Sequence, residues 1–285
     1  MDNKINIFIS FDLEGISGVS SWREMRKDSA DFMRTRRIAT QEINAVVRGI
    51  KKIRNIGEIL ICDAHASGEN LLIDELESGV HLIKGTQRNY YMMEGFNKNF
   101  DIVFFIGYHA MVGTPAGIMD HTYSSSSIYN IKINGVDVGE TEINAGIAGY
   151  YGVPVGLVSG DDKLINEVKR FLGAQVETVI TKYSISRFAA KCRHPVDVQN
   201  ELELRTQWAI KKIRKLKPFK FRQPINAEIE VINSLIGDAI KSLPGLKRIS
   251  GRGFVLKVKD ILEFYRYLML ICDLASYANS ILTTG

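Results

Sequence analysis

The sequence predicts an α/β fold in which a mostly parallel sheet is flanked by helices and followed by a smaller C-terminal α+β unit. Over residues 1–190, short apolar runs alternate with segments of helical length, which is typical of a parallel sheet covered on both faces. After about residue 190 this alternation gives way to a long amphipathic segment and scattered short strands. The chain of 285 residues is also long enough for two domains, at roughly 150 residues per domain.

The first expected strand is Ile5–Asp12, in which every second side chain from Ile5 onward is apolar and faces one side. A helix is expected over residues 31–54, because apolar residues recur there at close to the 3.6-residue period. Asn134-Gly135 lies between two short β runs, so residues 129–138 predict a hairpin. The remaining elements expected before residue 190 are strands at Glu58–Cys62, Val80–Ile83, Asp101–Ile106, Val153–Val158 and Val176–Thr181, with helices at 139–151 and 161–172.

The last third of the chain begins with an amphipathic helix expected over residues 196–215. Pro218 and Pro224 then bracket a basic loop. The elements expected after it are a strand at Ala227–Ile232, a helix at 233–242, a strand at Phe254–Val258 and a final helix at 260–281. We therefore expect two domains, residues 1–190 and residues 191–285.

The composition is that of a globular protein, with 45% hydrophobic and 24% charged residues, which excludes a disordered or collagen-like chain. The three cysteines are too few to crosslink a chain of this length, which favours a reducing compartment. No apolar run approaches the ~20 residues of a membrane span, and the first residues lack the apolar core of a signal peptide. We expect a cytoplasmic protein without a membrane partner.

The formal net charge of +5 is unevenly distributed along the chain. Residues 1–190 contain 20 Lys and Arg against 23 Asp and Glu, whereas residues 191–285 contain 17 against 9. Seven of these cations lie between Lys211 and Arg222, where Phe219 and Phe221 alternate with them. This stretch allows a nucleic-acid-binding function. We favour a solvated helix end, where cations complement the helix dipole, and expect no nucleic-acid partner.

Side chains of the types that bind metals follow three of the expected strands. Asp12 and Glu14 end the first strand and, being two residues apart, point the same way. His65 follows the second strand, and His109 follows the strand at 101–106. Ligands of open α/β sheets bind outside the carboxyl ends of the strands, so these side chains converge on one expected crevice. His121, in the next loop, and Glu140, at the start of a helix, can join them.

Other candidates have simpler interpretations. Asp63, at a strand end, is more typical of a turn or cap, and Asp161-Asp162 of a helix N-terminus. Cys62 lies in an apolar strand, which favours a buried and unreactive thiol. The sequence contains no glycine-rich nucleotide-binding loop.

Several segments resemble, in the same order, the motifs of the M55 family of metallopeptidases, the D-aminopeptidases of the DppA type. The resemblance spans the whole chain. The segments are Ser10–Gly18, Cys62–Ser67, Gly107–Ala110, Thr114-Pro115 with Met119–His121, Ile133–Glu140 and Val158–Asp162, and more weakly Ile185–Arg187.

The resemblance implies a dinuclear zinc site. Its five ligands fall on Asp12, Glu14, His65, His109 and Glu140, and an additional catalytic histidine falls on His121. The nitrogen and oxygen ligands suit Zn²⁺, with Mn²⁺ or Co²⁺ also possible. On this basis residues 1–190 are the metal-binding catalytic domain, and residues 191–285 serve oligomerisation or complete the pocket.

The expected function is that of a zinc-dependent aminopeptidase acting on short peptides, with N-terminal D-amino acids as in D-Ala-D-Ala. Two metals would activate a water, with His121 acting as nucleophile, general base or oxyanion stabiliser. An amidase or an L-aminopeptidase using the same site is the alternative. The resemblance also implies a homo-oligomer, in the form of a decameric ring, in which the basic stretch Lys211–Arg222 would be an interface or a pore lining. Small departures from the family pattern, such as Asp120 and the run Ser124–Ser127, concern substrate preference.

Overall fold

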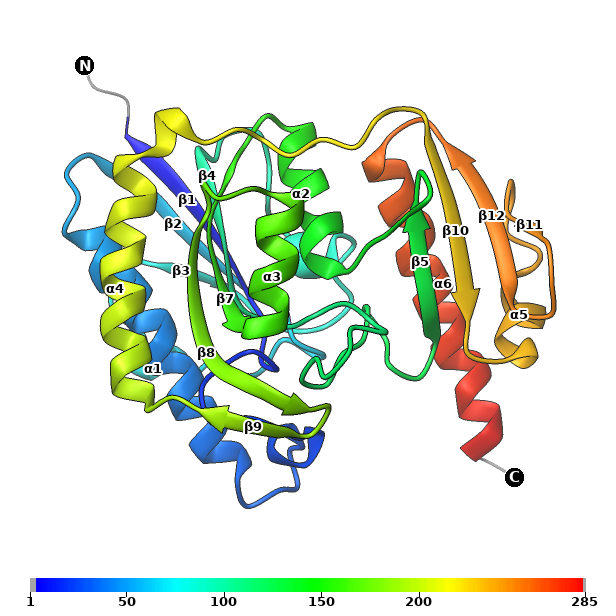
Figure 1. Ribbon diagram of the computed structural model, residues 1–285, viewed down its shortest axis with the longest axis horizontal. Coiled ribbons are helices and arrows are strands. Elements are labelled where there is room, and N and C mark those ends of the chain that lie inside the picture. The colour runs from blue at the N-terminus through cyan, green and yellow to red at the C-terminus, as the bar shows by residue number, and fades with distance from the viewer. Residues whose placement is uncertain (1–3, 284–285) are drawn as a thin grey trace.

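The computed structural model describes residues 4–283 and confirms the predicted α/β class. The main sheet has seven strands in the order β3-β2-β1-β4-β7-β8-β9 (Figure 1). Neighbouring strands run parallel, except that β9 is antiparallel to β8. The strands are β1 (Ile5–Phe11), β2 (Ile56–Asp63), β3 (His81–Ile83), β4 (Ile102–Tyr108), β7 (Val155–Asp161), β8 (Glu177–Ser186) and β9 (Ala189–Cys192).

Helices cover both faces of this sheet. On one face α1 (Phe32–Lys51) and α4 (Pro195–Lys211) pack side by side, and on the other lie α2 (Glu140–Tyr150) and α3 (Asp162–Phe171) (Figure 1). Alternate residues of β1 serve the two faces: Ile7 and Ile9 pack in the cluster with α1, and Phe8 packs in the other. Because both faces are buried, the parallel strands read as nearly continuous apolar runs.

A second, antiparallel sheet of five strands has the order β11-β12-β10-β5-β6. Asn134 and Gly135, both with positive φ, form the turn of the predicted hairpin. The helices α5 (Ser234–Ile240) and α6 (Ile261–Thr283) support this sheet. Its strands are β5 (Ile128–Ile133), β6 (Val136–Asp137), β10 (Ile225–Val231), β11 (Lys247–Arg248) and β12 (Gly253–Val258).

The two sheets do not divide at residue 190. The hairpin of β5 and β6 precedes that residue yet pairs with β10, and α4 follows it yet packs on α1 in the first layer. Local sequence patterns predict the elements but not their distant partners. The boundary drawn at residue 190 is therefore not a boundary between the two sheets.

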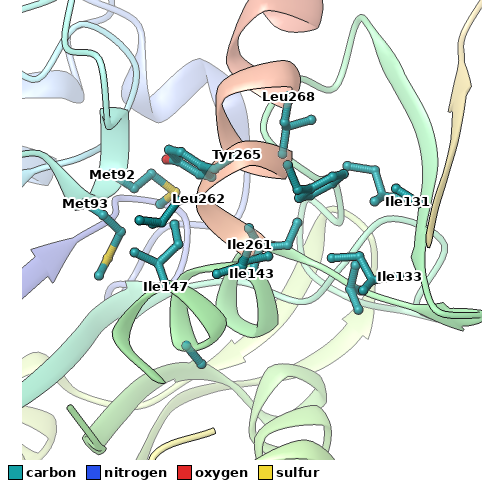
Figure 2. Close-up of a cluster of buried hydrophobic side chains, with 14 of the residues drawn as sticks. Met92, Met93, Ile131, Ile133, Ile143, Ile147, Ile261, Leu262, Tyr265 and Leu268 are labelled. Carbon is teal, nitrogen blue, oxygen red and sulfur yellow. The ribbon is translucent and has the colours of Figure 1, made fainter. Parts of the chain in front are cut away.

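A continuous apolar cluster joins the two sheets through α2 and α6. Figure 2 shows the part of it around α2 and α6. Each fully buried large apolar side chain of this kind contributes roughly 1.5–3 kcal/mol relative to an exposed one. The N-terminal end of α2 is thereby held against the end of the main sheet. The labelled members are Met92, Met93, Ile131, Ile133, Ile143, Ile147, Ile261, Leu262, Tyr265 and Leu268.

Most element boundaries lie within a few residues of the predicted ones. The expected helix at 196–215 ends as an α-helix at Lys211 and continues as a 3-10 turn at Ile213–Lys215. The sequence did not predict the short strands β9 and β11, nor the 3-10 helices at Trp22–Met25, Ile73–Glu75 and Tyr91–Met93. Within residues 4–283, no helix has the length and apolar character needed to cross a membrane.

Candidate metal centre

The main sheet contains a switch point between β1 and β4. From β1 the chain adds β2 and β3 on one side, and then returns to add β4, β7 and β8 on the other. The carboxyl ends of strands at such a reversal are the usual ligand site of an open α/β sheet. Asp12 directly follows β1, His65 lies just after β2, and His109 directly follows β4. The carboxyl ends of three adjacent strands thus place potential ligands close together.

The other three candidate residues reach the same place from loops and a helix terminus. Glu14 lies in the loop after β1, and His121 lies in the loop between β4 and β5. Glu140 is the first residue of α2, where the helix dipole favours a carboxylate. The structure therefore brings together all six residues that the sequence singled out: Asp12, Glu14, His65, His109, His121 and Glu140.

The two oxygens of Asp12 face different histidines. Asp12 Oδ1 lies 3.3 Å from His65 Nδ1, whereas Asp12 Oδ2 lies 3.4 Å from His109 Nε2. Each histidine also faces a second carboxylate. His65 Nδ1 lies 2.9 Å from Glu14 Oε2, and His109 Nε2 lies 3.4 Å from Glu140 Oε1. Through these contacts Asp12 faces two pairs of potential ligands, Glu14 with His65 and Glu140 with His109. The ligand atoms of Asp12, Glu14 and His109 also lie within 4.8 Å of one another.

Unpartnered polar atoms indicate that this cluster fits a metal ion. Asp12 Oδ2 and His109 Nε2 are buried, face each other, and have no hydrogen-bond partner among the described residues. Buried polar atoms are rarely left in this state. Ligand atoms held at ~2.0–2.1 Å by a tetrahedral zinc ion lie roughly 3.3–3.4 Å apart, close to the observed spacing. Mixed imidazole and carboxylate ligands also suit Zn²⁺ and its neighbours in the first transition row.

The backbone fixes which ring nitrogen of two histidines is available. Nδ1 of His109 donates to the carbonyl oxygen of Ala110 at 2.9 Å, and Nδ1 of His121 donates to that of Met119 at 2.8 Å. Because a carbonyl oxygen only accepts, the neutral rings carry their hydrogen on Nδ1 and leave a lone pair on Nε2. The two rings stack with centroids 4.0 Å apart.

Burial and the closeness of the charged groups shift the pKa values of the cluster. Burial raises the pKa of Asp12 to about 7, and the neighbouring Glu14 adds to this effect. Burial alone would lower the pKa of His109, but Glu140 and Asp12 raise it well above its ordinary value. His121 differs, because burial and the adjacent His109 both lower its pKa. Of the two stacked histidines, His121 is the one whose pKa is lowered, which favours its neutral form.

A hydrogen-bond network beneath the cluster was not predicted from the sequence. The Tyr108 hydroxyl lies 2.6 Å from Ser10 Oγ and accepts from Asn144 Nδ2 at 3.0 Å. Asn144 Oδ1 accepts from the Tyr123 hydroxyl at 2.9 Å, and the Tyr123 amide donates to Glu140 Oε1 at 2.6 Å. This network ties β1, β4 and α2 together around the candidate ligands. Ser10 and Tyr108 fall within segments that resemble the family motifs, but the sequence does not show that they bond to Asn144 and Tyr123, which lie far from them along the chain.

A cavity of about 230 Å³ opens onto the cluster and is lined by Asp12, Glu14, His65, His121 and Glu140, with Trp22 and Tyr123 among its other walls. His109 does not line it: its side chain is 2% exposed, against 12% for that of His121. His121 also borders a neighbouring cavity of about 740 Å³. His121 is thus placed to meet a molecule that enters the site.

Asp63 and Asp161 have the structural roles that the sequence favoured for them. Asp63 accepts from the backbone amides of Asn70 and Leu71 at 2.6 and 2.9 Å, and thereby shapes the loop that carries His65. Asp161 caps α3 and accepts from the amides of residues 163 and 164.

The thiol of Cys62 is buried as predicted, and burial raises its pKa to about 11. A thiol with so high a pKa is almost entirely protonated near neutral pH and is a poor nucleophile.

The aromatic residues of the basic stretch pack against α2. A Cβ atom placed on Gly149 would lie 1.6 Å from the carbonyl oxygen of Phe219, and one on Gly146 would lie 2.6 Å from the ring of Phe221. Both aromatic side chains are partly buried against the apolar core. Among the cations, Lys212 pairs with Glu177. These contacts do not form an exposed platform on which bases could stack.

Comparisons with known proteins point to one family. The family model of peptidase M55, described as D-aminopeptidase, matches residues 5–270. A D-aminopeptidase of Bacillus subtilis (strain 168) is 33% identical over 277 residues, which cover 95% of this chain and 98% of that protein. The solved structure of the Zn-dependent D-aminopeptidase DppA from Bacillus subtilis, described as a self-compartmentalizing protease, matches with a TM-score of 0.90 and 31% identity. That match covers 95% of this chain and 98% of the solved one.

Proposed function

The chain belongs to the M55 family of peptidases, and from this premise we propose that it is a zinc-dependent aminopeptidase that removes N-terminal D-amino acids from short peptides of the D-Ala-D-Ala type. The observation that carries the proposal is the position of Asp12, whose two oxygens face His65 and His109 separately. A carboxylate in this position is suited to bridge two metal ions.

The proposed centre holds two Zn²⁺ ions, for which Mn²⁺ or Co²⁺ can substitute. Glu14 and His65 would hold one ion, His109 and Glu140 the other, and Asp12 both. Buried carboxylates at this density need compensating positive charge, and two divalent cations provide it. When bound, zinc supplies a Lewis acid that polarises the scissile carbonyl and lowers the pKa of water.

His121 is proposed as the general base. Its Nε2 carries the lone pair and lies 3.8 Å from the nearest oxygens of Glu14 and Glu140, and the residue borders the cavity. The bond from Nδ1 to Met119 keeps the ring in this tautomer, and its lowered pKa keeps it neutral. In this role Nε2 takes a proton from the attacking water and returns it to the departing amine.

The volume of the cavity bears on the size of the substrate. A space of about 230 Å³ is below the usual 300–1,000 Å³ of small-molecule pockets, which favours a small N-terminal residue such as D-Ala. Because DppA is described as self-compartmentalizing, we extend a homo-oligomeric assembly to this chain. We propose a decameric ring, as the family resemblance implies, and a cytoplasmic location, as the sequence composition favours. Residues 191–285 would contribute to that assembly or complete the pocket. Exposed apolar residues of α6, Leu270 and Tyr277, are available for such a contact.

Hydrolysis of D-Ala-D-Ala and of L-Ala-L-Ala by protein purified without added zinc tests this function. We expect cleavage of the D dipeptide, little cleavage of the L dipeptide, loss of activity with a chelator and recovery with Zn²⁺. Equal cleavage of the L dipeptide would indicate an L-aminopeptidase, and cleavage of D-alaninamide alone an amidase, at the same site. Turnover that a chelator does not affect would contradict the proposal.

A further inference from the structure

A buried lysine lies beneath the loop that carries Glu14. Lys182, on β8, is 0% exposed. Its ammonium group donates to three backbone carbonyl oxygens of that loop, those of Glu14, Ile16 and Val19, with the bond to Ile16 at 3.0 Å. An ammonium group has three hydrogens to donate, so these bonds use all of them.

Lys182 is not part of an ordinary buried ion pair. Among residues 4–283, no carboxylate lies within ion-pair distance of its ammonium group. Burying a charge is costly, and an apolar side chain of similar length would fill the same space without that cost. Unlike an apolar side chain, the ammonium group binds three carbonyl groups at once and thereby fixes the path of the loop.

Neighbouring elements clamp the same loop. The hydroxyl of Thr181, also on β8, donates to the carbonyl of Gly15, and Glu42 on α1 accepts from the amide of Ser17 at 2.8 Å. The amide of Gly15 in turn donates to the carbonyl of Gly107, at the end of β4, at 2.7 Å. A Cβ atom on Gly15 would lie 1.9 Å from the carbonyl oxygen of Tyr108, so the loop sits directly against β4.

The clamp acts on residues that face the metal site. Lys182 binds the carbonyl group of Glu14, the same residue whose carboxylate lies 2.9 Å from His65. We propose that Lys182 is a positioning residue of the metal centre: by fixing the backbone at Glu14, it directs that carboxylate toward the site and so sets the affinity for zinc. This inference rests on the proposed function, because it requires that the site bind zinc.

The test compares zinc binding by the full-length K182M variant, the wild type and a control, V179A. Methionine keeps the length of the side chain and removes the ammonium group. Val179 lies on the same strand and is equally buried, but its side chain makes no hydrogen bond. Competition with a chromophoric chelator measures the dissociation constant for Zn²⁺, the visible spectrum of the Co²⁺-loaded protein reports ligand geometry, and thermal unfolding of the metal-free proteins reports stability.

We expect K182M to bind zinc roughly tenfold or more weakly and to show an altered Co²⁺ spectrum, as the loss of outer-shell partners typically does. V179A should lose thermal stability but keep the wild-type zinc affinity and spectrum. Wild-type zinc affinity and spectrum in K182M, with only its stability lowered, would overturn the inference.

A second variant keeps the inference testable if K182M does not fold. T181V removes only the hydroxyl bond to Gly15 and should weaken zinc binding by about two- to tenfold, as the loss of one hydrogen bond predicts. If K182M does not fold, an unchanged zinc affinity in T181V would overturn the inference that side-chain hydrogen bonds to this loop set the affinity for zinc. Failure of the wild type to bind zinc would instead overturn the proposed function, and this inference with it.

Discussion

Replacing His121 with alanine is expected to lower kcat for D-Ala-D-Ala hydrolysis by about 100- to 10,000-fold, the range that general-base catalysis contributes. The reason is geometric. His121 borders the cavity, its Nδ1 is held by the Met119 carbonyl group, and its pKa is lowered, which favours a neutral imidazole. Zinc content and thermal stability should stay near those of the wild type, because the five proposed ligands remain. Steady-state kinetics together with metal analysis of the purified variant measure both effects.

The control for this variant is His81→Ala. His81 is exposed, lies on β3 and is absent from the cluster, so its loss should leave kcat and zinc content unchanged. His121, His109 and Glu140 also form a group whose ligand atoms lie within 4.8 Å of one another. Loss of zinc from His121→Ala would therefore identify His121 as a ligand and contradict its assignment as the base.

Replacing Asp12 with asparagine is expected to reduce both metal binding and activity. Asparagine keeps the size of the side chain but turns one oxygen into an amide nitrogen that does not bind zinc. Asp12 is the carboxylate that faces both His65 and His109, so both groups of ligands lose an oxygen or an anionic charge. Metal analysis should show fewer than two zinc ions per chain, and kcat should fall about 1,000-fold or more, since a metal Lewis acid contributes several kcal/mol to the barrier.

Asp101→Asn is a matched control for this substitution. Asp101 precedes β4 at the opposite end of that strand, and its carboxylate accepts from the amide of Asn6 at 2.7 Å. The Asp101→Asn protein should keep full zinc content and activity. An Asp12→Asn protein that retained two zinc ions and wild-type kcat would exclude a bridging role for Asp12.

The sequence predicted the main sheet well because parallel strands buried on both faces produce a local signal. Every second residue of Ile5–Asp12 from Ile5 onward is apolar, Asp101–Ile106 is apolar after its first residue, and the structure places strands at both. The clustering of candidate ligands also followed from a local rule, since the carboxyl ends of parallel strands meet at one edge. His65 and His109 come together for that reason.

Features that depend on contacts between distant segments could not be predicted in this way. The pairing of β5 with β10 joins segments far apart in the sequence, and no local pattern indicates it. Lys182 lies in a run of β-forming residues, where a lysine reads as a solvent-facing position, and only the structure shows its bonds to the loop after β1. The hydrogen bond between Asn144 and Tyr108 also joins segments far apart in the sequence, so no local pattern predicts it.

Titration of the metal-free protein with Zn²⁺, while D-Ala-D-Ala hydrolysis is followed, tests the central claim most directly. The two groups of ligands that share Asp12 predict that activity is absent without metal and reaches its maximum at two zinc ions per chain. Full activity without metal, or no hydrolysis of the D dipeptide once two zinc ions are bound, would contradict the assignment of this chain as a dinuclear zinc D-aminopeptidase.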